Sequence, residues 1–392
     1  MKKRICIVSF STIRRDARVL REVQYLNSNY DLLVIGFGGL PQGFSGNSSI
    51  RWNAIKPFPP HFFTRAKGWL TLGLIGWILP KFYESWYWGK PVYQEALRIM
   101  LENKCHLIHA NDWDALPVAA EAARITGAKL VFDAHEYSPL MFEDVFFWRW
   151  LYSRPIQYFF RRYFPAIDAA ITVAPRIADR YREEWGLNPV VVLNAPDYVH
   201  LPKKVHLLTD ELHLVHHGGA NPSRRLELMI EAIGSCRPGI YMHLMLVNGD
   251  SKYVRKLETL AEKVAPGKVT FLQPVSPSQI PEEISQFDIG VYLLKPSNFN
   301  QRVALPNKFF DFLQAGLAVC IGPSPSMADI VNEYGCGWVV PTFQPKDMAE
   351  VINQIDCNEL MEKQQAAQEA ALNFNAKIEM GKVLDIYQEL LS

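Results

Sequence analysis

The stretch KLVFDAHEYS, residues 129–138, ends an apolar run with three titratable side chains, Asp133, His135 and Glu136. In an open parallel α/β sheet, working residues gather at the carboxyl ends of the strands. An imidazole or a carboxylate at such a strand end could bind hydroxyl groups or move a proton. Polar residues also occur wherever a strand leaves the core for solvent. We take His135 and Glu136 as candidate catalytic residues.

A second candidate site lies in LHLVHHGGANPSRRLELMIEAI, residues 212–233, which reads as strand, glycine turn, basic pair and helix. Gly218 and Gly219 would let the backbone approach a ligand closely, as a tight turn alone would also permit. Arg224 and Arg225 are expected to open the helix, where a cation is unfavourable against the helix dipole unless an anion binds there. The segment therefore predicts a bound phosphate, with an exposed arginine pair as the alternative.

The third candidate lies in VALPNKFFDFLQAGLAVCIG, residues 303–322. Pro306 leads into a helix, so the amides of Asn307 and Lys308 face an anion at its positive end. Asp311 lies on the same helical face, and a carboxylate there can accept hydrogen bonds from both hydroxyls of a ribose. The alternative for Asp311 is a solvated helix residue near a favourable dipole.

Other acidic and imidazole residues have simpler explanations. The pair Asp112 and Asp114 has the spacing of a divalent-ion site, but both precede a helix, where capping is the commoner reason for Asp. Asp112 stays a minor catalytic candidate, and Asp16 is expected to cap the helix after the first strand. His109 has apolar neighbours and is expected in the core. No metal site is predicted.

These candidates must be positioned by βα units, because apolar runs of strand length alternate with helical patterns in both halves of the chain. A chain of 392 residues also exceeds what one hydrophobic core usually supports. Strands are expected at residues 4–10, 31–37, 107–110, 129–134 and 169–174, and then at 212–219, 242–249, 268–273, 288–294, 318–322 and 337–340.

The repeated rhythm predicts an α/β protein of two doubly wound Rossmann-like domains that face a central cleft. A stretch bearing Pro and Lys at 194–211 interrupts it and is interpreted as the linker. The expected domains are residues 1–200 and 201–375, and a last helix at about 376–392 is expected to pack back on the first domain.

Composition indicates a soluble globular protein. Charged residues make up 21% of the chain and the net charge is +1, which disfavours nucleic acid as a partner. The six cysteines show no CxxC spacing, which fits a reducing cytoplasm. The first apolar stretch is too short for a signal peptide. Residues 69–80 form an uncharged run of twelve, below the roughly 20 residues that cross a bilayer.

Two segments, 56–95 and 140–165, are crowded with Trp, Tyr, Phe and Arg. Aromatic residues are enriched in cores, so internal packing is one interpretation. The other is a basic, aromatic face at a membrane surface, where apolar and cationic groups act together. A protein with such a face would lie at the inner face of the plasma membrane.

At this point the chain resembles a known family, the GT-B glycosyltransferases, and within them the large retaining group often called family 4. Nearly the whole length resembles the family, and ALPNKFFDFLQAGLAV at 304–319 is similar to its donor-binding signature. HGGANPSRRLELMIEAI at 217–233 is similar to the segment that holds the nucleotide diphosphate. HANDWDALPVAAEAARITGAKLVFDAHE at 109–136 is similar to the acceptor-side segment of polysaccharide-building members.

The resemblance implies roles for particular residues. Arg224 and Lys308 would hold the diphosphate, Asp311 would bind the ribose, and His135 would approach the donor sugar from the other domain. The family typically carries two glutamates eight positions apart, where this chain has Val303 and Asp311. A basic residue usually follows its glycine, where this chain has Gly219. Both departures bear on the donor sugar and its diphosphate.

The leading hypothesis is a retaining, metal-independent transferase. It would move a sugar from a nucleotide-diphosphate donor to a glycan or lipid-linked acceptor in bacterial polysaccharide or glycoconjugate assembly. No cofactor is implied, since fixed cations would do the work of a metal. A nucleotide-sugar epimerase or phosphorylase on the same scaffold is an alternative, and Val303 makes a non-catalytic sugar-nucleotide binding subunit another. A nicotinamide-dependent oxidoreductase is disfavoured, because no G-x-G-x-x-G follows the first strand.

Overall fold

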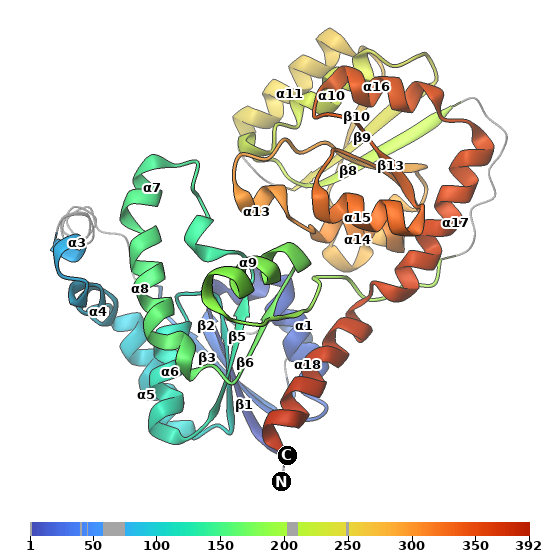
Figure 1. Cartoon of the computed structure of the whole chain (residues 1–392). Helices are drawn as coiled ribbons and strands as arrows, with labels where there is room; N and C mark the ends of the chain where they lie inside the picture. Colours follow the sequence, from blue (N-terminus) through green and yellow to red (C-terminus); the bar gives the residue numbers. More distant parts are fainter. Residues whose placement is uncertain (1, 40, 45, 58–74, 202–210, 248–250) are drawn as a thin grey trace. The chain divides into compact units, whose positions relative to one another are not determined.

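The computed structural model describes residues 2–392 except 40, 45, 58–74, 202–210 and 248–250 (Figure 1). Parts of the aromatic segment 56–95 and of the linker 194–211 therefore lie outside the described residues. The chain divides into two compact units. Unit 1 comprises Met1–Val192, Asn298–Asn300 and Met380–Ser392, and unit 2 comprises Leu193–Ser297 and Gln301–Glu379.

Unit 1 is built on a parallel sheet of seven strands in the order β3-β2-β1-β4-β5-β6-β7. The five expected strands are present, and β3 and β7 are additional. β3 lies at the sheet edge, and polar residues interrupt the apolar ones along it. β7 has only two residues, so neither strand forms an apolar run. The strands are β1 Arg4–Thr12, β2 Asp31–Phe37, β3 Ile50–Ile55, β4 Leu107–Asn111, β5 Lys129–Ala134, β6 Ala169–Thr172 and β7 Val190–Val191.

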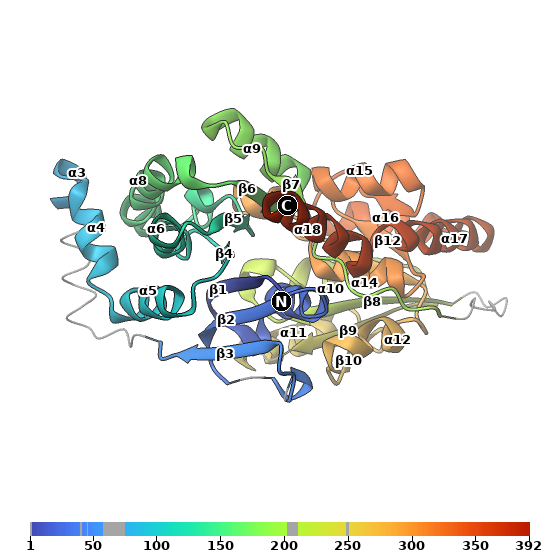
Figure 2. The same ribbon diagram turned by 90° about the horizontal axis from the view of Figure 1, so that it is seen from below.

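Helices cover both faces of this sheet: α5, α6 and α8 lie on one face and α1 and α18 on the other (Figure 2). On the second face, Met380, Val383 and Tyr387 of α18 pack in one core cluster with Ile5 and Ile7 of β1. The helices are α1 Ala17–Leu26, α3 Gly76–Ile78, α4 Lys81–Trp88, α5 Pro91–Asn103, α6 Leu116–Thr126, α7 Phe146–Leu151, α8 Ser153–Tyr163, α9 Pro175–Trp185 and α18 Ala376–Leu391.

One of the capping predictions is confirmed and the other is wrong. The Asp16 side chain caps α1 by accepting a hydrogen bond from the Val19 amide at 3.3 Å, as expected. The capping role predicted for Asp112 and Asp114 is wrong, because α6 begins at Leu116 without a side-chain cap. Asp112 instead has a left-handed backbone with a φ of 68°.

Unit 2 has a parallel sheet of six strands in the order β10-β9-β8-β11-β12-β13, with all six expected strands present. The strands are β8 Leu212–Gly219, β9 Ile240–Val247, β10 Val269–Leu272, β11 Ile289–Tyr292, β12 Ala318–Ile321 and β13 Gly337–Val339. The helices are α10 Glu227–Gly234, α11 Ser251–Val264, α12 Ile280–Ile284, α13 Phe299–Arg302, α14 Asn307–Gln314, α15 Pro325–Tyr334, α16 Pro345–Gln354 and α17 Cys357–Asn373.

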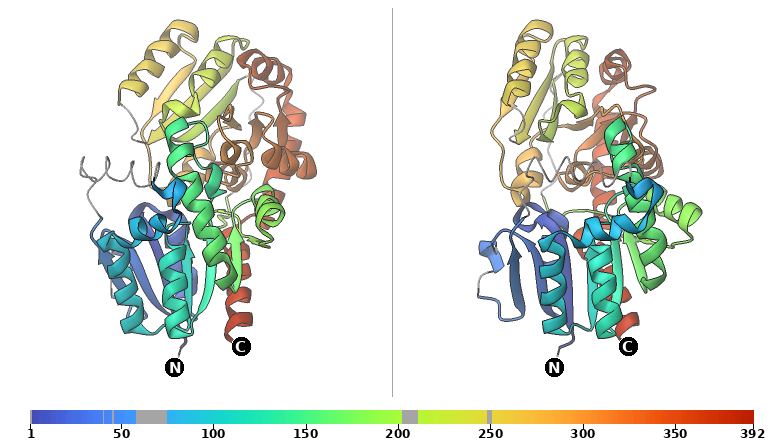
Figure 3. Two further views of the ribbon diagram at one scale, coloured as in Figure 1. Left: turned by 60° about the vertical axis from the view of Figure 1, so that its left-hand side comes forward. Right: turned by 90° about the vertical axis from the view of Figure 1, so that its left-hand side faces the viewer.

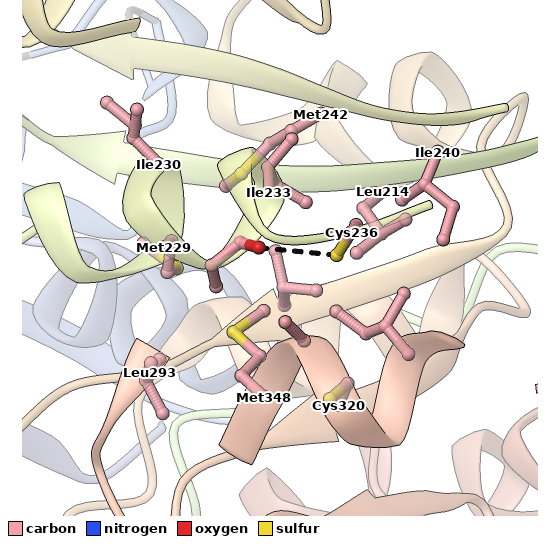
Figure 4. Packing of buried hydrophobic residues seen from close by; sticks show 14 of the residues in the cluster. Leu214, Met229, Ile230, Ile233, Cys236, Ile240, Met242, Leu293, Cys320 and Met348 are labelled. Carbon is pink, nitrogen blue, oxygen red and sulfur yellow. Dashed lines mark hydrogen bonds between the residues drawn. The ribbon is translucent and has the colours of Figure 1, made fainter. Parts of the chain in front are cut away.

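The core of unit 2 is apolar and includes sulfur-bearing side chains. Figure 4 shows Cys236, Cys320 and Met242 among buried isoleucine and leucine side chains. The Cys236 thiol donates a hydrogen bond to the Ala232 carbonyl at 3.3 Å, which satisfies this weak donor within its own helix end. Five of the six cysteines are buried.

Candidate functional site

Two cationic side chains of unit 2 converge beside the end of β8. Gly218, with a φ of 117°, lies so close to them that an added Cβ would stand 2.9 Å from Lys308 Nζ and 3.7 Å from Arg224 Nη1. Only glycine combines this backbone conformation with this clearance. The structure thus brings together Gly218, Arg224 and Lys308, all predicted as donor-binding residues.

Lys308 is buried, with 5% of its surface exposed. Its ammonium group lies 3.1 Å from Nε2 of His216 and 5.2 Å from the centre of the Tyr292 ring. Burial lowers the pKa of Lys308 well below its ordinary value, the charge on Arg224 lowers it further, and Asp311 opposes the change. Within the described residues neither Lys308 nor Arg224 forms an ion pair. A buried cation without a carboxylate partner favours an anionic ligand.

The arginine pair does not open the helix, so that prediction is wrong. Pro222–Arg224 form a 3₁₀ turn in which the Asn221 side chain accepts from the Ser223 amide at 3.0 Å. Arg225 then has a left-handed backbone, and α10 begins only at Glu227. Arg224 therefore reaches the glycine turn from a loop, and the argument from the helix dipole does not apply to it.

Asp311 lies inside the site, one turn along α14 from Lys308, and only 7% of its surface is exposed. This burial excludes the solvated-residue alternative. Its Oδ2 lies 3.3 Å from Nε2 of His217. Burial, together with the charges of Lys308 and Arg224, lowers the pKa of His217 to about 3, so its ring is neutral. A buried carboxylate beside a neutral imidazole can accept hydrogen bonds from a diol.

His216 and His217 were missed as site residues in the sequence. The available signal was two adjacent histidines at the carboxyl end of a buried strand, directly before the glycine turn. Their place in an apolar run made them resemble core residues. Both are buried, at 1% and 5% exposure, yet both face charged groups of the site.

The remaining predicted donor-binding residues lie at the rim of this group. Pro306 occupies the N-cap position of α14, and Asn307 is its exposed first residue. Gly219 has no neighbour within 4 Å of an added Cβ, so space does not require glycine there. α14 itself packs tightly on the sheet, because a Cβ at Gly290 of β11 would stand 2.2 Å from the Phe312 ring.

In unit 1, His135 stands where β4 and β5 end side by side, with Asn111 paired to Asp133 in the parallel register. Its Nε2 lies 2.9 Å from Asn111 Oδ1 and 3.5 Å from Asp133 Oδ2. Its Nδ1 lies 3.3 Å from Asp112 Oδ2. Burial alone would lower the pKa of His135, but Asp112 and Asp133 hold it well above its ordinary value. The ring is therefore an imidazolium that donates hydrogen bonds.

A buried ion pair between Arg18 and Asp133 lies beside His135. Arg18 of α1 donates to both carboxylate oxygens of Asp133, at 2.5 and 2.9 Å, and to the Val192 carbonyl at 2.9 Å. Arg18 is 3% exposed and Asp133 is fully buried. Burial would raise the pKa of Asp133, but Arg18 and His135 hold it well below its usual range. The paired carboxylate thus stays charged beside the imidazolium.

Three buried side chains of this cluster, Glu22, His109 and Asp133, have ligand atoms within 4.8 Å of one another, as a metal ion would require. Arg18 already neutralises Asp133, so a divalent ion would face a guanidinium at this position. His109 is fully buried, as its sequence context predicts, and its Nδ1 lies 2.5 Å from the hydroxyl of Tyr387 in α18. The cluster thus joins α1, two strands and the last helix.

Glu136, next to His135, is the group of unit 1 best suited to proton transfer. Burial raises its pKa to about 7, with a further contribution from Asp112, while His135 opposes the change. Asp114 has a similar pKa of about 7 for the same two reasons. A carboxyl group that titrates near neutral pH can serve as a general base or acid.

Two family models match the chain. One, described as Glycosyltransferase Family 4, matches residues 58–197, and the other, described as Glycosyl transferases group 1, matches residues 201–374. The chain belongs to the GT-B glycosyltransferases. This confirms the resemblance noted in the sequence and favours sugar transfer over epimerisation, phosphorolysis or binding without turnover. None of the curated proteins compared with the glycosyltransferase matches it.

Solved structures share the fold along the whole chain. HepE from Anabaena in complex with UDP and glucose is 16% identical, with a TM-score of 0.70, covering 99% of this glycosyltransferase and 100% of that chain. Sucrose-phosphate synthase from Thermosynechococcus elongatus is 14% identical, with a TM-score of 0.70 and coverage of 100% and 99%. The E. coli trehalose-6-phosphate structure bound with UDP-2-fluoro glucose is 12% identical, with a TM-score of 0.67 and coverage of 98% and 99%.

The buried pair in unit 1 yields a stability prediction. Arg18→Met leaves Asp133 charged and uncompensated in the core, so we expect the free energy of unfolding to fall by about 3–5 kcal/mol. Arg98→Met breaks an exposed ion pair with Glu95 and Glu102 and should change it little. Urea unfolding followed by circular dichroism measures both variants. Equal stability of Arg18→Met and the wild type would contradict the role assigned to the pair.

Proposed function

We propose that this glycosyltransferase uses a nucleotide-diphosphate sugar as its donor and that unit 2 binds it. Arg224 and Lys308 hold the diphosphate at Gly218, and Asp311 accepts the ribose hydroxyls. The observation that carries the proposal is the convergence of two cations, one of them buried, without a carboxylate partner among the described residues. Structures of HepE with UDP and with UDP-glucose support this donor class.

The same cations supply the chemistry of bond cleavage. As the bond between the anomeric carbon and the diphosphate lengthens, negative charge grows on the leaving group, and fixed cations in a dry site stabilise it. Lys308 and Arg224 thereby take the part that a divalent ion plays in other transferases. We propose transfer without a metal ion or other cofactor, and with retention at the anomeric carbon.

In unit 1, His135, Glu136 and Asp112 are the proposed catalytic residues. His135 is charged, and both of its N–H groups already face Asn111 and Asp112, so its proposed contribution is a fixed positive charge beside the donor sugar rather than a hydrogen bond. Glu136, with a pKa of about 7, accepts the proton of the acceptor hydroxyl. Asp112, whose carboxylate faces His135 Nδ1, keeps the ring charged and oriented. The proposed acceptor is a glycan or a lipid-linked sugar in bacterial polysaccharide or glycoconjugate assembly.

The aromatic segments of unit 1 support peripheral contact with the inner face of the plasma membrane, with the protein otherwise cytoplasmic. Within the described ranges, no helix has the length and apolar character needed to span a bilayer. Large apolar side chains are nevertheless exposed around α3 and α7, namely Trp77, Ile78, Leu79, Phe142, Val145, Phe146, Phe147 and Trp150.

Cations lie among these apolar side chains. α3 and α4 lie beside α8, as both views of Figure 3 show. Trp77, Tyr83 and Tyr158 line a pocket of about 270 Å³ together with Arg154 and Arg161. Arg162 pairs with Glu84, whereas Arg154 and Arg161 form no ion pair within the described residues. Exposed aromatics with unpaired cations match an anionic lipid surface.

The donor proposal predicts binding and turnover. UDP or another nucleoside diphosphate from a panel should raise the melting temperature of the wild type, because a ligand of the native state stabilises it. Lys308→Met should weaken binding at least about tenfold. Lys295→Met, which alters an exposed lysine of the same unit, should bind as the wild type does. Transfer should continue in EDTA. If no nucleotide or nucleotide sugar shifts the melting temperature, the donor proposal fails.

The proton-transfer role of Glu136 predicts a pH profile. Its raised pKa means that the carboxylate is half-formed at about pH 7, so kcat should rise through that pH and level off above it. Glu136→Gln should lower kcat by about 10²–10⁴ and remove the rising limb. Glu183→Gln, at an exposed glutamate of α9, serves as the control. An unchanged pH profile in Glu136→Gln would show that another group accepts the proton.

The membrane proposal predicts binding to anionic vesicles. Wild-type protein should cosediment with vesicles of phosphatidylglycerol and phosphatidylcholine more than with phosphatidylcholine alone. Phe146→Ser with Phe147→Ser should lower the partition coefficient at least about tenfold, because two apolar anchors are lost. Ile125→Ser, at an exposed residue of α6, should not. Equal sedimentation of all three proteins would remove α7 from the membrane contact.

A further inference from the structure

His216, a residue that the proposed function does not use, fixes the position of Lys308. The ring lies on β8 with 1% of its surface exposed. Its Nδ1 is 2.8 Å from the carbonyl oxygen of Val291 on β11, and its Nε2 is 3.1 Å from Lys308 Nζ. A carbonyl oxygen only accepts, so Nδ1 carries the proton and Nε2 has a free lone pair. Lys308 therefore donates its hydrogen bond to Nε2.

The ring is also held by packing. It stacks on Tyr292 with ring centres 5.9 Å apart and planes at 17°. The Lys308 ammonium lies over the same Tyr292 ring. The sheet thus fixes the direction of His216 Nε2. This nitrogen in turn holds Nζ of Lys308 beside Gly218. A lysine side chain has four rotatable bonds and would otherwise sample many positions.

An uncharged acceptor suits an anion-binding lysine better than a carboxylate would. Burial and the charge of Lys308 lower the pKa of His216 well below its ordinary value, so the ring stays neutral. A carboxylate at this place would pair with Lys308 and neutralise it before a ligand arrived. A neutral imidazole holds the amine without competing for its charge.

Five ionisable side chains face Lys308 from the elements packed around it. They are two neutral imidazoles of β8, one guanidinium, one phenol ring and one carboxylate. These groups are His216, His217, Arg224, Tyr292 and Asp311. A diphosphate would add negative charge to this set, and would favour the protonated lysine.

We propose that His216 is the positioning residue of the donor site, holding Lys308 against Gly218 as an uncharged hydrogen-bond acceptor so that its charge stays available to the diphosphate. The proposal rests on the proposed function, because it assumes that the diphosphate binds at Lys308.

Calorimetry with UDP, and with inorganic pyrophosphate as a probe that lacks a base, tests this. His216→Leu should weaken UDP binding about tenfold, the loss of one charge-assisted hydrogen bond. His216→Gln keeps an uncharged acceptor and should recover to within about threefold of the wild type. His213→Gln, on the same strand outside the donor site, is the control and should bind as the wild type does.

A double-mutant comparison separates positioning from general stability. His216→Glu should weaken binding more than His216→Leu does, since its carboxylate would pair with Lys308 and compete with the diphosphate. In a Lys308→Met background, His216→Leu should change affinity less than about twofold, because the two residues act as one unit.

The outcomes distinguish the two proposals. If the wild type binds UDP and His216→Leu binds it equally well, the His216 proposal is overturned and the donor proposal stands. If His216→Leu weakens binding just as much in the Lys308→Met background, its effect is general and the His216 proposal is overturned too. If the wild type binds no nucleoside diphosphate and no pyrophosphate, both proposals are overturned.

Discussion

The site proposed in unit 2 depends on one buried amine, that of Lys308. Lys308 lies in the interior of unit 2, where the desolvation of a charge is costly, and among the described residues its amine bonds to the imidazole of His216 rather than to a carboxylate. Three features position this amine: the glycine turn, the 3₁₀ turn that carries Arg224, and the close packing of α14 on Gly290. A buried amine of this kind would attract an anion more strongly than a surface lysine does, because water and salt screen the surface charge.

The buried charges of unit 1, unlike Lys308, are paired with opposite charges. Arg18 and Asp133 satisfy each other with two hydrogen bonds, and the pair stabilises the imidazolium of His135 at the strand ends. Because Arg18, Asp133 and His135 each face an opposite charge, these contacts fix their geometry. Glu136, beside it, and Asp114 have pKa values of about 7 and titrate near neutral pH. The buried charges of unit 1 are thus paired, whereas Lys308 of unit 2 has no carboxylate partner among the described residues.

Much of this was accessible from the sequence. Buried strands are short apolar runs, so all six strands of unit 2 and the five apolar ones of unit 1 were found, while the half-exposed β3 was not. The helix α14 and the placement of Lys308 and Asp311 on one of its faces were predicted from their spacing. The helix starts near Arg224 and Asp114 were placed wrongly, because the backbone is left-handed at Arg225, directly after Arg224, and at Asp112, two residues before Asp114. Backbone handedness at a non-glycine residue leaves no reliable mark in residue types.

Pattern alone was enough to specify the parallel sheets, the glycine at 218 and the acidic and basic groups at the strand ends, because alternation and helical spacing are local properties. The roles of those groups arose only on folding. His216 looked like a core residue until Val291, far along the chain, defined which nitrogen carries its proton. His135 looked like a base until Asp112 and Asp133 surrounded it and made it a cation. Protonation depends on burial and on neighbours distant in sequence, and these exist only once the chain has folded.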